Sequence, residues 1–256
     1  MADLTGDGYP DAALTNIDWP QTPVERPVRL LANNGDGSFR GGDGLIAGAA
    51  PKVRRVSRIV AADFNRSGRD GLLFLEQGFD LAGGQNKLLL YNGDGRYADA
   101  TGNLPQQVAR SVDADAADLR GLGPDLVVFN DWAGGAENKK PMQFWANDGA
   151  GRFALDQSRL PADLLGNHTF TAGKFIGTSG GPKDLAVFGN QSEPSNWYLK
   201  NDGSGRFGKL AALPPKPFGN NAYAVSVVGG DLDGDGLPDL VAAYLNGATF
   251  ADSALQ

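Results

Sequence analysis

The stretch DLDGDGLPDLVAAY, residues 231–244, decides the fold because related stretches recur along the chain. It places four aspartates on a short glycine-containing loop and follows them with an apolar run of strand length. The recurring stretches begin at Asp3, Asp63, Asp118, Lys174 and Asp231. Successive anchors lie 60, 55, 56 and 57 residues apart. A regular period of this size is the signature of a repeat architecture, so one unit of the repeat sets the fold.

A second element lies between the anchors and follows the same period. It reads NNGDGSF, NGDGRY, NDGAGRF and NDGSGRF, ending at Phe39, Tyr97, Phe153 and Phe207. Asn and Gly adopt the positive φ angles that tight hairpin turns require. Each complete unit therefore contains two hairpin connections, one acidic and one rich in Asn and Gly.

The apolar runs between these connections are short and are bounded by Gly and Asp, which is typical of buried strands. Such runs are 223–228 and 240–244 in the last unit, and 87–91 and 197–200 in earlier units. Each repeat of about 57 residues is predicted to be a four-stranded antiparallel meander, and radial repetition of such sheets is a β-propeller. We expect a single all-β propeller domain or fragment over residues 1–256. It would hold four hairpin-complete units and a partial fifth, cut from a larger propeller; a compact ring of four or five blades is the alternative.

Composition limits the classes of function. The chain has 23 basic and 30 acidic residues and a net charge of −7, and no basic block stands out along it. This argues against binding nucleic acid or an anionic membrane. The absence of cysteine excludes disulfides and thiolate metal sites, and the single histidine, His168, disfavours most zinc chemistry. No apolar run approaches the roughly 18 residues of a membrane span, and we expect that a signal segment is absent from this sequence.

The acidic loops have the residue types and the spacing of calcium sites. Alternate positions of a tightly turned loop direct their oxygens at one centre, and calcium takes about six to eight hard oxygen ligands. Without a cation, carboxylates held this close repel one another. An EF-hand is excluded because position 12 of these loops carries no Glu. The predicted ligands are Asp231, Asp233, Asp235, the Leu237 carbonyl and Asp239 in the last loop, and Asp3, Thr5, Asp7, the Tyr9 carbonyl and Asp11 in the first.

The second acidic loop keeps only part of this pattern. Asp63, Asn65 and Ser67 hold positions 1, 3 and 5, but Gly71 replaces the acid at position 9. This loop is therefore a weaker calcium candidate than the first and last loops.

The third and fourth loops depart further. The third offers Asp118 and Asp125, with Arg120 and Leu122 at inner positions, and we expect no metal there. In the fourth loop Lys174 replaces the leading acid. Its ammonium group either takes the place of the cation or points into solvent.

The loop D-x-[DNT]-x-D-G-x-x-D, followed by an apolar strand and then N-[DG]-G-x-G-x-F, resembles the FG-GAP/VCBS repeat family over essentially the whole chain. Integrin α-subunit propellers, certain fungal lectins and many secreted bacterial proteins belong to that family. The resemblance implies an extracellular or cell-surface propeller that binds calcium in its loops and a glycan or a protein as ligand. Millimolar external calcium suits the roughly 10⁻⁴–10⁻³ M affinities of extracellular modules.

The meander also predicts where a ligand binds. Acidic loops and Asn/Gly turns emerge at one end of the sheets, so the long variable connections emerge at the other. Three of these connections hold an aromatic ring beside an acid, which suits sugars because their C–H faces stack on rings. The predicted ligand-binding residues are Trp19 with Asp18, Phe79 with Asp80, and Trp132 with Asp131. The alternative is that these rings fill seams between sheets. Trp145, Trp197 and the aromatic residues that end the Asn/Gly turns sit in or beside strands, and we expect them in the core.

Together these features favour a calcium-stabilised, non-catalytic recognition module for a glycan or a cell-surface protein in an extracellular setting. Its other partners would be further blades of its parent chain. Two alternatives stay open: a propeller scaffold of a secreted polysaccharide-processing enzyme, and a structural spacer in a large secreted polypeptide.

Overall fold

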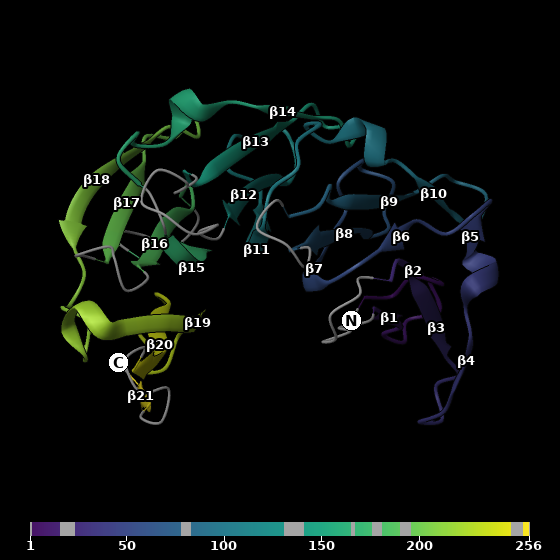
Figure 1. The fold of residues 1–256 in the computed structure, drawn as a ribbon, viewed down its shortest axis with the longest axis horizontal. Coiled ribbons are helices and arrows are strands. Elements are labelled where there is room, and N and C mark those ends of the chain that lie inside the picture. Colours follow the sequence, from purple (N-terminus) through teal and green to yellow (C-terminus); the bar gives the residue numbers. More distant parts are fainter. Residues whose placement is uncertain are drawn as a thin grey trace. The chain divides into compact units, whose positions relative to one another are not determined.

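The computed structural model is all-β (Figure 1) and describes residues 2–15, 24–77, 83–130, 141–164, 167–175, 181–189, 196–246 and 253–255. The chain divides into two compact units. Unit 1 is Met1–Val112 with Leu122–Asp125 and Ala146–Ala154, and unit 2 is Asp113–Gly121 with Leu126–Trp145 and Leu155–Gln256. In the part of the chain that the structure describes, no helix is long and apolar enough to cross a membrane.

The first repeat forms a three-stranded antiparallel sheet with the order β1-β3-β4. Its Asn/Gly turn closes with Asn33 opposite Phe39, as the hairpin motif predicts. A separate two-stranded ribbon, β2–β6, pairs Arg26 with Val53. The elements are β1 (Ala12–Leu14), β2 (Arg26–Pro27), β3 (Arg29–Asn33), β4 (Phe39–Gly41), the 3₁₀ turn η1 (Asp43–Leu45) and β6 (Lys52–Val53).

The second repeat forms the predicted four-stranded meander and gains one strand. The sheet has the order β5-β10-β9-β8-β7, and β5 pairs in parallel with β10, with Ile46 opposite Tyr97. The segment after the first repeat supplies β5, which covers the otherwise unpaired edge of β10. The elements are β5 (Ile46–Ala47), β7 (Val56–Ala62), β8 (Gly71–Glu76), β9 (Lys87–Tyr91), β10 (Tyr97–Asp99) and η2 (Thr101–Asn103).

The third and fourth repeats are four-stranded sheets with the orders β11-β12-β13-β14 and β15-β16-β17-β18, and the fifth has the order β19-β20-β21. The predicted four-stranded unit is therefore confirmed in the second, third and fourth repeats. The elements of the third and fourth repeats are β11 (Ser111–Ala117), β12 (Asp125–Asn130), β13 (Gln143–Asn147), β14 (Phe153–Leu155), η4 (Gln157–Arg159), β15 (Asn167–Gly173), β16 (Asp184–Gly189), β17 (Trp197–Asn201) and β18 (Phe207–Ala212). Those of the fifth are η5 (Gly219–Asn221), β19 (Ala222–Gly230), β20 (Asp239–Asn246) and β21 (Ser253–Leu255).

The second strand of each middle repeat is buried on both faces. All six residues of β8, β12 and β16 are buried, so these strands read as continuous apolar runs rather than as alternating ones. In unit 1 this core includes Leu30, Phe74 and Leu89. In unit 2, Phe188 and Tyr244 pack in a second core with ring centroids 6.5 Å apart.

The aromatic residues expected in the core follow that expectation with two departures. The buried members are Trp145, Tyr97, Phe153 and Phe207. Trp197 is only half-buried, and the Lys209 ammonium lies 4.3 Å from the centre of its ring. The expectation is wrong for Phe39, whose side chain is 43% exposed.

The reason for this exposure lies in how successive repeats meet within each unit. The Tyr97 hydroxyl of the second repeat donates a hydrogen bond to the Leu4 carbonyl in the first acidic loop, and Phe153 packs edge-on against Phe64 in the second loop, 5.6 Å between centroids. An Asn/Gly turn thus covers position 2 of the preceding acidic loop. Phe39 belongs to the first repeat, so this sequence supplies no preceding loop for it. Leu232, at position 2 of the last loop, is 70% exposed.

Candidate metal centre

The last acidic loop joins β19 to β20 and brings three carboxylates together. One oxygen each from Asp231, Asp233 and Asp239 lie within 4.8 Å of one another. Asp231 also closes the loop, because its two oxygens accept hydrogen bonds from the backbone NH groups of Gly234 (2.7 Å) and Gly236 (2.9 Å). Both glycines have φ near 80°, a conformation that a side chain disfavours. The loop is therefore shaped by its own backbone to hold oxygens in one place.

The other predicted ligands of this loop are placed differently. Asp235 is not part of the three-carboxylate group, and its Oδ1 accepts a hydrogen bond from the backbone NH of Leu237 at 2.8 Å. Asp239 accepts one from the backbone NH of Leu232 at 2.9 Å, which ties the end of the loop back to its start. The structure thus assembles three of the four predicted carboxylates.

The first acidic loop repeats this construction. The two oxygens of Asp3 accept hydrogen bonds from the NH groups of Gly6 and Gly8. Slight burial acts to raise the pKa of Asp3, but those backbone hydrogen bonds and the nearby Arg69 outweigh it and hold that pKa below its usual value. Asp7 accepts a hydrogen bond from the NH of Tyr9, so it occupies the place that Asp235 has in the last loop.

Position 3 carries the clearest sign that the loops are shaped for a ligand. Thr5 Oγ1 in the first loop and Asn65 Oδ1 in the second are buried and have no hydrogen-bond partner among the described residues. Such atoms normally find a partner, because burial without one costs about 1–3 kcal/mol. An oxygen-seeking cation at the loop centre would satisfy both. The residues present therefore fit calcium, which would supply charge neutralisation and fix the loop.

The second loop keeps the same start but is closed at its end. The two oxygens of Asp63 accept hydrogen bonds from Ser67 and Gly68, both at 2.8 Å. A Cβ atom on Gly71 would lie 2.8 Å from Leu90 and 2.9 Å from the Leu89 carbonyl, so position 9 has no room for an acid. The loop therefore retains its hydrogen-bonded cap but lacks a place for a carboxylate at position 9.

Arg69 belongs to the second acidic loop, and its side chain contacts the first acidic loop. Its guanidinium lies against Gly6, where any Cβ would be about 2 Å from it, and it stacks over the Tyr91 ring at 5.3 Å. Asp3, Gly6 and Arg69 line one pocket of about 380 Å³. Arg69 thus supplies part of the positive charge that the first loop needs, so that loop has the weaker demand for a cation.

In the fourth loop, the structure favours one of the two expectations for Lys174. Its Nζ lies 4.0 Å from Asp184 Oδ2, and its side chain is only 19% exposed, so the solvent-facing alternative is wrong. Asp184 is fully buried and also accepts a hydrogen bond from the Tyr198 hydroxyl. Burial raises the pKa of Tyr198, and the hydrogen bond to Asp184 and its charge raise it further, which keeps the hydroxyl protonated. A lysine ammonium thus stands beside the acid of this loop.

The acid that ends each loop has a structural role that the motif did not reveal. Asp11, Asp125 and Asp184 each accept a hydrogen bond from the backbone NH of an asparagine at the end of the third strand. Those distances are 2.8, 2.9 and 2.8 Å, and the asparagines are Asn33, Asn147 and Asn201. These asparagines open the Asn/Gly motif in three repeats, each six residues before the aromatic residue that ends it, and this recurrence is the signal that could have found the link.

The predicted ligand-binding residues lie outside the described part of the chain. They are Asp18, Trp19, Phe79, Asp80, Asp131 and Trp132. Their assignment stays a prediction from the sequence.

Comparison with known families places the repeat. A sequence model of the FG-GAP-like repeat matches residues 3–74 and 181–242, which is 134 of the 256 residues and includes the first and last acidic loops. The chain belongs to the FG-GAP-like repeat family. FG-GAP-like repeats often bind calcium and are typical of extracellular proteins. A search of curated proteins gave no match to the chain.

Proposed function

We propose that this chain is a calcium-stabilised, non-catalytic recognition module that acts outside the cell and binds a glycan or a surface protein. The observation that carries the proposal is the convergence of Asp231, Asp233 and Asp239 in a loop held by backbone hydrogen bonds. Carboxylates this close repel one another. A cation that binds the folded loop and not the unfolded chain would therefore stabilise the fold.

We propose further that the antiparallel sheets are blades of a β-propeller and that additional repeats complete it. Radial repetition of short four-stranded sheets is the architecture that such repeats favour. The exposed Leu232 and Phe39 support this, because their counterparts Leu4, Phe64 and Tyr97 are almost fully buried where repeats meet. A repeat of the same kind has the apolar surface that each of them lacks.

A calcium-titrated melting curve tests the metal part of the proposal. Calcium at about ten times its dissociation constant contributes roughly 1.4 kcal/mol, which raises the melting temperature of a chain this size by about 2–4 °C. We expect that rise in the unmodified protein and in Asp94→Ala, which removes an exposed acid from an Asn/Gly turn. Asp233→Ala should lose much of it. Equal melting curves in calcium and in chelator would refute an occupied loop.

A glycan array with a parallel assay for polysaccharide turnover tests the recognition part. Saturable binding of one glycan class without turnover is the expected result. Turnover would instead support the enzyme-scaffold alternative. Silence in both assays, with no surface protein captured, would leave the structural spacer.

A further inference from the structure

Unit 1 carries a local excess of positive charge that the chain as a whole does not. Residues 24–58 contain seven Lys or Arg and three Asp or Glu, a net charge of +4, whereas the whole chain carries −7. The net charge of the whole chain does not reveal this basic cluster, because the acidic residues outside residues 24–58 outnumber the basic ones. Its members outside the Asn/Gly turn are Arg26, Arg29, Lys52, Arg54, Arg55 and Arg58.

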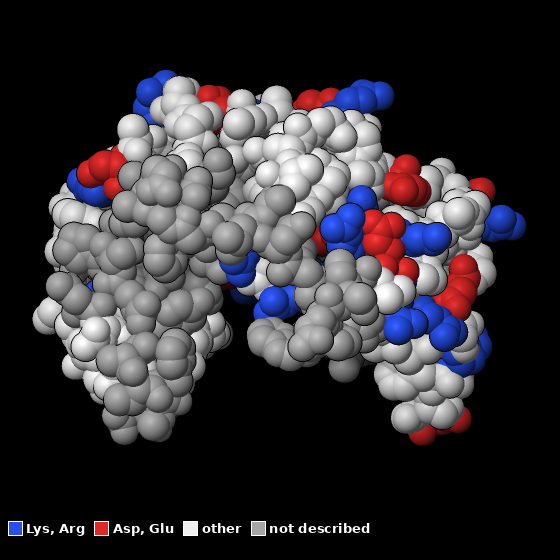
Figure 2. All heavy atoms as spheres, in the orientation of Figure 1, with Lys and Arg blue, Asp and Glu red and all other residues white. Residues whose placement is uncertain are grey.

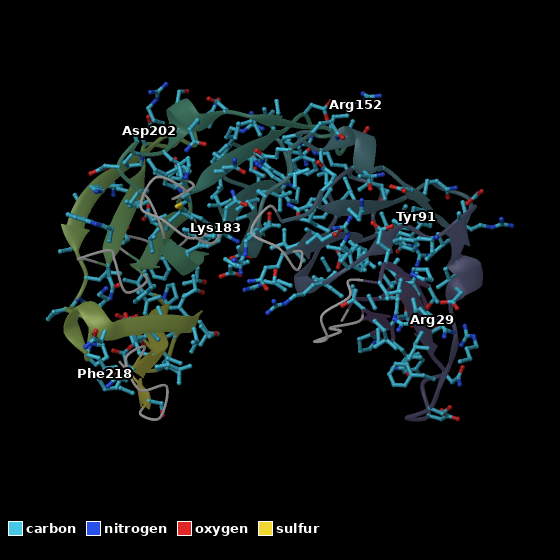
Figure 3. All side chains as sticks on the ribbon, in the orientation of Figure 1. Arg29, Tyr91, Arg152, Lys183, Asp202 and Phe218 are labelled. Atoms are coloured by element: carbon cyan, nitrogen blue, oxygen red, sulfur yellow. The ribbon has the colours of Figure 1, made fainter. Side chains whose placement is uncertain are left out.

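Strand pairing places these basic residues at the end of the sheet away from the acidic loop. β1 leaves Asp11 and pairs with β3 until Leu14 lies opposite Arg29. The β2–β6 ribbon sets Pro27 opposite Lys52. Figure 3 labels Arg29 on β3, and Figure 2 shows blue side chains gathered over the same elements. The first repeat is thus acidic at its loop end and basic at its opposite end.

A pocket lies at this basic end. It has a volume of about 370 Å³ and is lined by Leu14, Thr15, Arg26, Pro27 and Arg29, within the roughly 300–1,000 Å³ of small-ligand sites. Leu14 is 47% exposed and forms an apolar wall. The lining therefore combines two guanidinium groups, one hydroxyl and an aliphatic surface.

The guanidinium group of Arg29 is oriented by an acid. Nε and Nη2 of Arg29 each lie 2.9 Å from Asp43 Oδ2, which sets the plane of the group. A guanidinium has five donors, so this contact leaves others for a ligand. Arg26 and Lys52 are exposed on the ribbon beside it. The planar, fixed donors of Arg29 suit the paired oxygens of a carboxylate or a sulfate.

We propose that this pocket binds an acidic saccharide, with the carboxylate of a uronic acid or a sulfate ester on the arginines. The C–H face of the sugar ring would lie against Leu14 and Pro27, and the Thr15 hydroxyl would contact a ring hydroxyl. The inference rests on the proposed recognition function and names its ligand class. Single-stranded nucleic acid fits less well, because its bases stack on aromatic rings and the lining residues are aliphatic or polar.

Binding of short oligosaccharides measured by calorimetry tests this assignment. The probes are an oligogalacturonate, a heparin oligosaccharide and a neutral dextran oligosaccharide, each with the full chain. The double variant Arg26→Ser/Arg29→Ser removes the two guanidinium groups that line the pocket. The matched control Arg40→Ser/Arg96→Ser removes two exposed charges of the same unit, one from β4 and one from an Asn/Gly turn. Melting curves of both variants confirm that each is folded.

The acidic probes should bind the unmodified protein and the control variant, and each lost contact to the charged group should weaken binding by about tenfold. Binding of the oligogalacturonate shows that a carboxylate is sufficient, whereas binding of heparin alone would show that sulfate is required. Equal weakening in both variants, or equal competition by single-stranded DNA, would overturn the proposed pocket. Binding of neutral sugars alone would overturn it and leave the recognition function standing, whereas no binding of any glycan or surface protein would remove both.

Discussion

Asp11 accepts three backbone hydrogen bonds from two parts of the first repeat. Its Oδ2 receives the NH groups of Leu4 (2.7 Å) and Thr5 (2.9 Å), and its Oδ1 receives that of Asn33. Asp11 and Leu4 are buried, so the NH group of Leu4 is left without a partner if the carboxylate is lost, whereas the donors of Thr5 and Asn33 are only partly buried. The acid that ends a loop therefore holds the sheet together whether or not a cation is bound, and its two roles are separable by experiment.

Asp11→Ala should lower the free energy of unfolding by about 1–3 kcal/mol, because the buried donor of Leu4 is left without a partner. Urea unfolding in the presence of a chelator measures this cost without any contribution from calcium. Asp36→Ala is the control, since Asp36 is exposed and accepts only local hydrogen bonds from Ser38. A loss below about 1 kcal/mol in Asp11→Ala would show that the donors find other partners.

The packing at the start of β8 explains why the second repeat has no acid at position 9. Gly71 opens a strand whose six residues are all buried, and the side chains of Phe64 and Leu90 close over it. In the first, third and fourth repeats an aspartate at this place accepts a hydrogen bond from the third strand. In the second repeat, apolar packing around Gly71 replaces that hydrogen bond. The start of β8 is therefore held by apolar contacts, and its loop has no acid at position 9.

Gly71→Ala should destabilise the protein by about 1–3 kcal/mol, the usual cost of forcing a methyl group into a packed site. Gly208 offers a matched control because it lies in strand β18, where a Cβ atom would have nothing within 4 Å of it. Alanine there should be neutral or stabilising by up to about 1 kcal/mol, since glycine weakens a strand. Equal effects in the two variants, measured by urea unfolding, would mean that the contacts around Gly71 are not tight.

Elements with a local signal could be predicted from the sequence, and those that depend on distant pairing could not. The run 87–91 and the Asn/Gly turns could be predicted because strand length and positive φ depend on residues that are close in sequence. The parallel addition of β5 and the ribbon β2–β6 depend on which distant segment meets which edge. The same limit applies to the site: spacing predicted the cluster around Asp231 but not the removal of Asp235 from it.

Lys174 shows at a single position what the sequence does not predict. Its type and its place in the repeat left two outcomes open, and only the fold shows that a buried acid, Asp184, lies 4.0 Å away. The basic end of unit 1 is a second example, since residues 26–29 and 52–58 join one surface only through the β2–β6 pairing.

The chain divides into two compact units, and each contains a loop that fits calcium. The loop of Asp3 and Thr5 lies in unit 1 and that of Asp231 and Asp233 in unit 2. Under the proposed function, calcium bound to either loop would stabilise the strands that the loop joins, because opening those strands would release the ion. The effect of the metal on local opening should therefore stay within the unit that binds it.

Hydrogen exchange of backbone amides, with calcium and with chelator, tests this division over the whole chain. Removing calcium should speed exchange in β19 and β20, and Asp233→Ala should reproduce that effect in the presence of calcium while β7–β9 keep their protection. Asp3→Ala should instead speed exchange in β1 and β3, and by less, because Arg69 already supplies positive charge beside that loop. Faster exchange in both units after the single change at Asp233 would contradict the division, since it would show that one loop sets the stability of the sheets in both units.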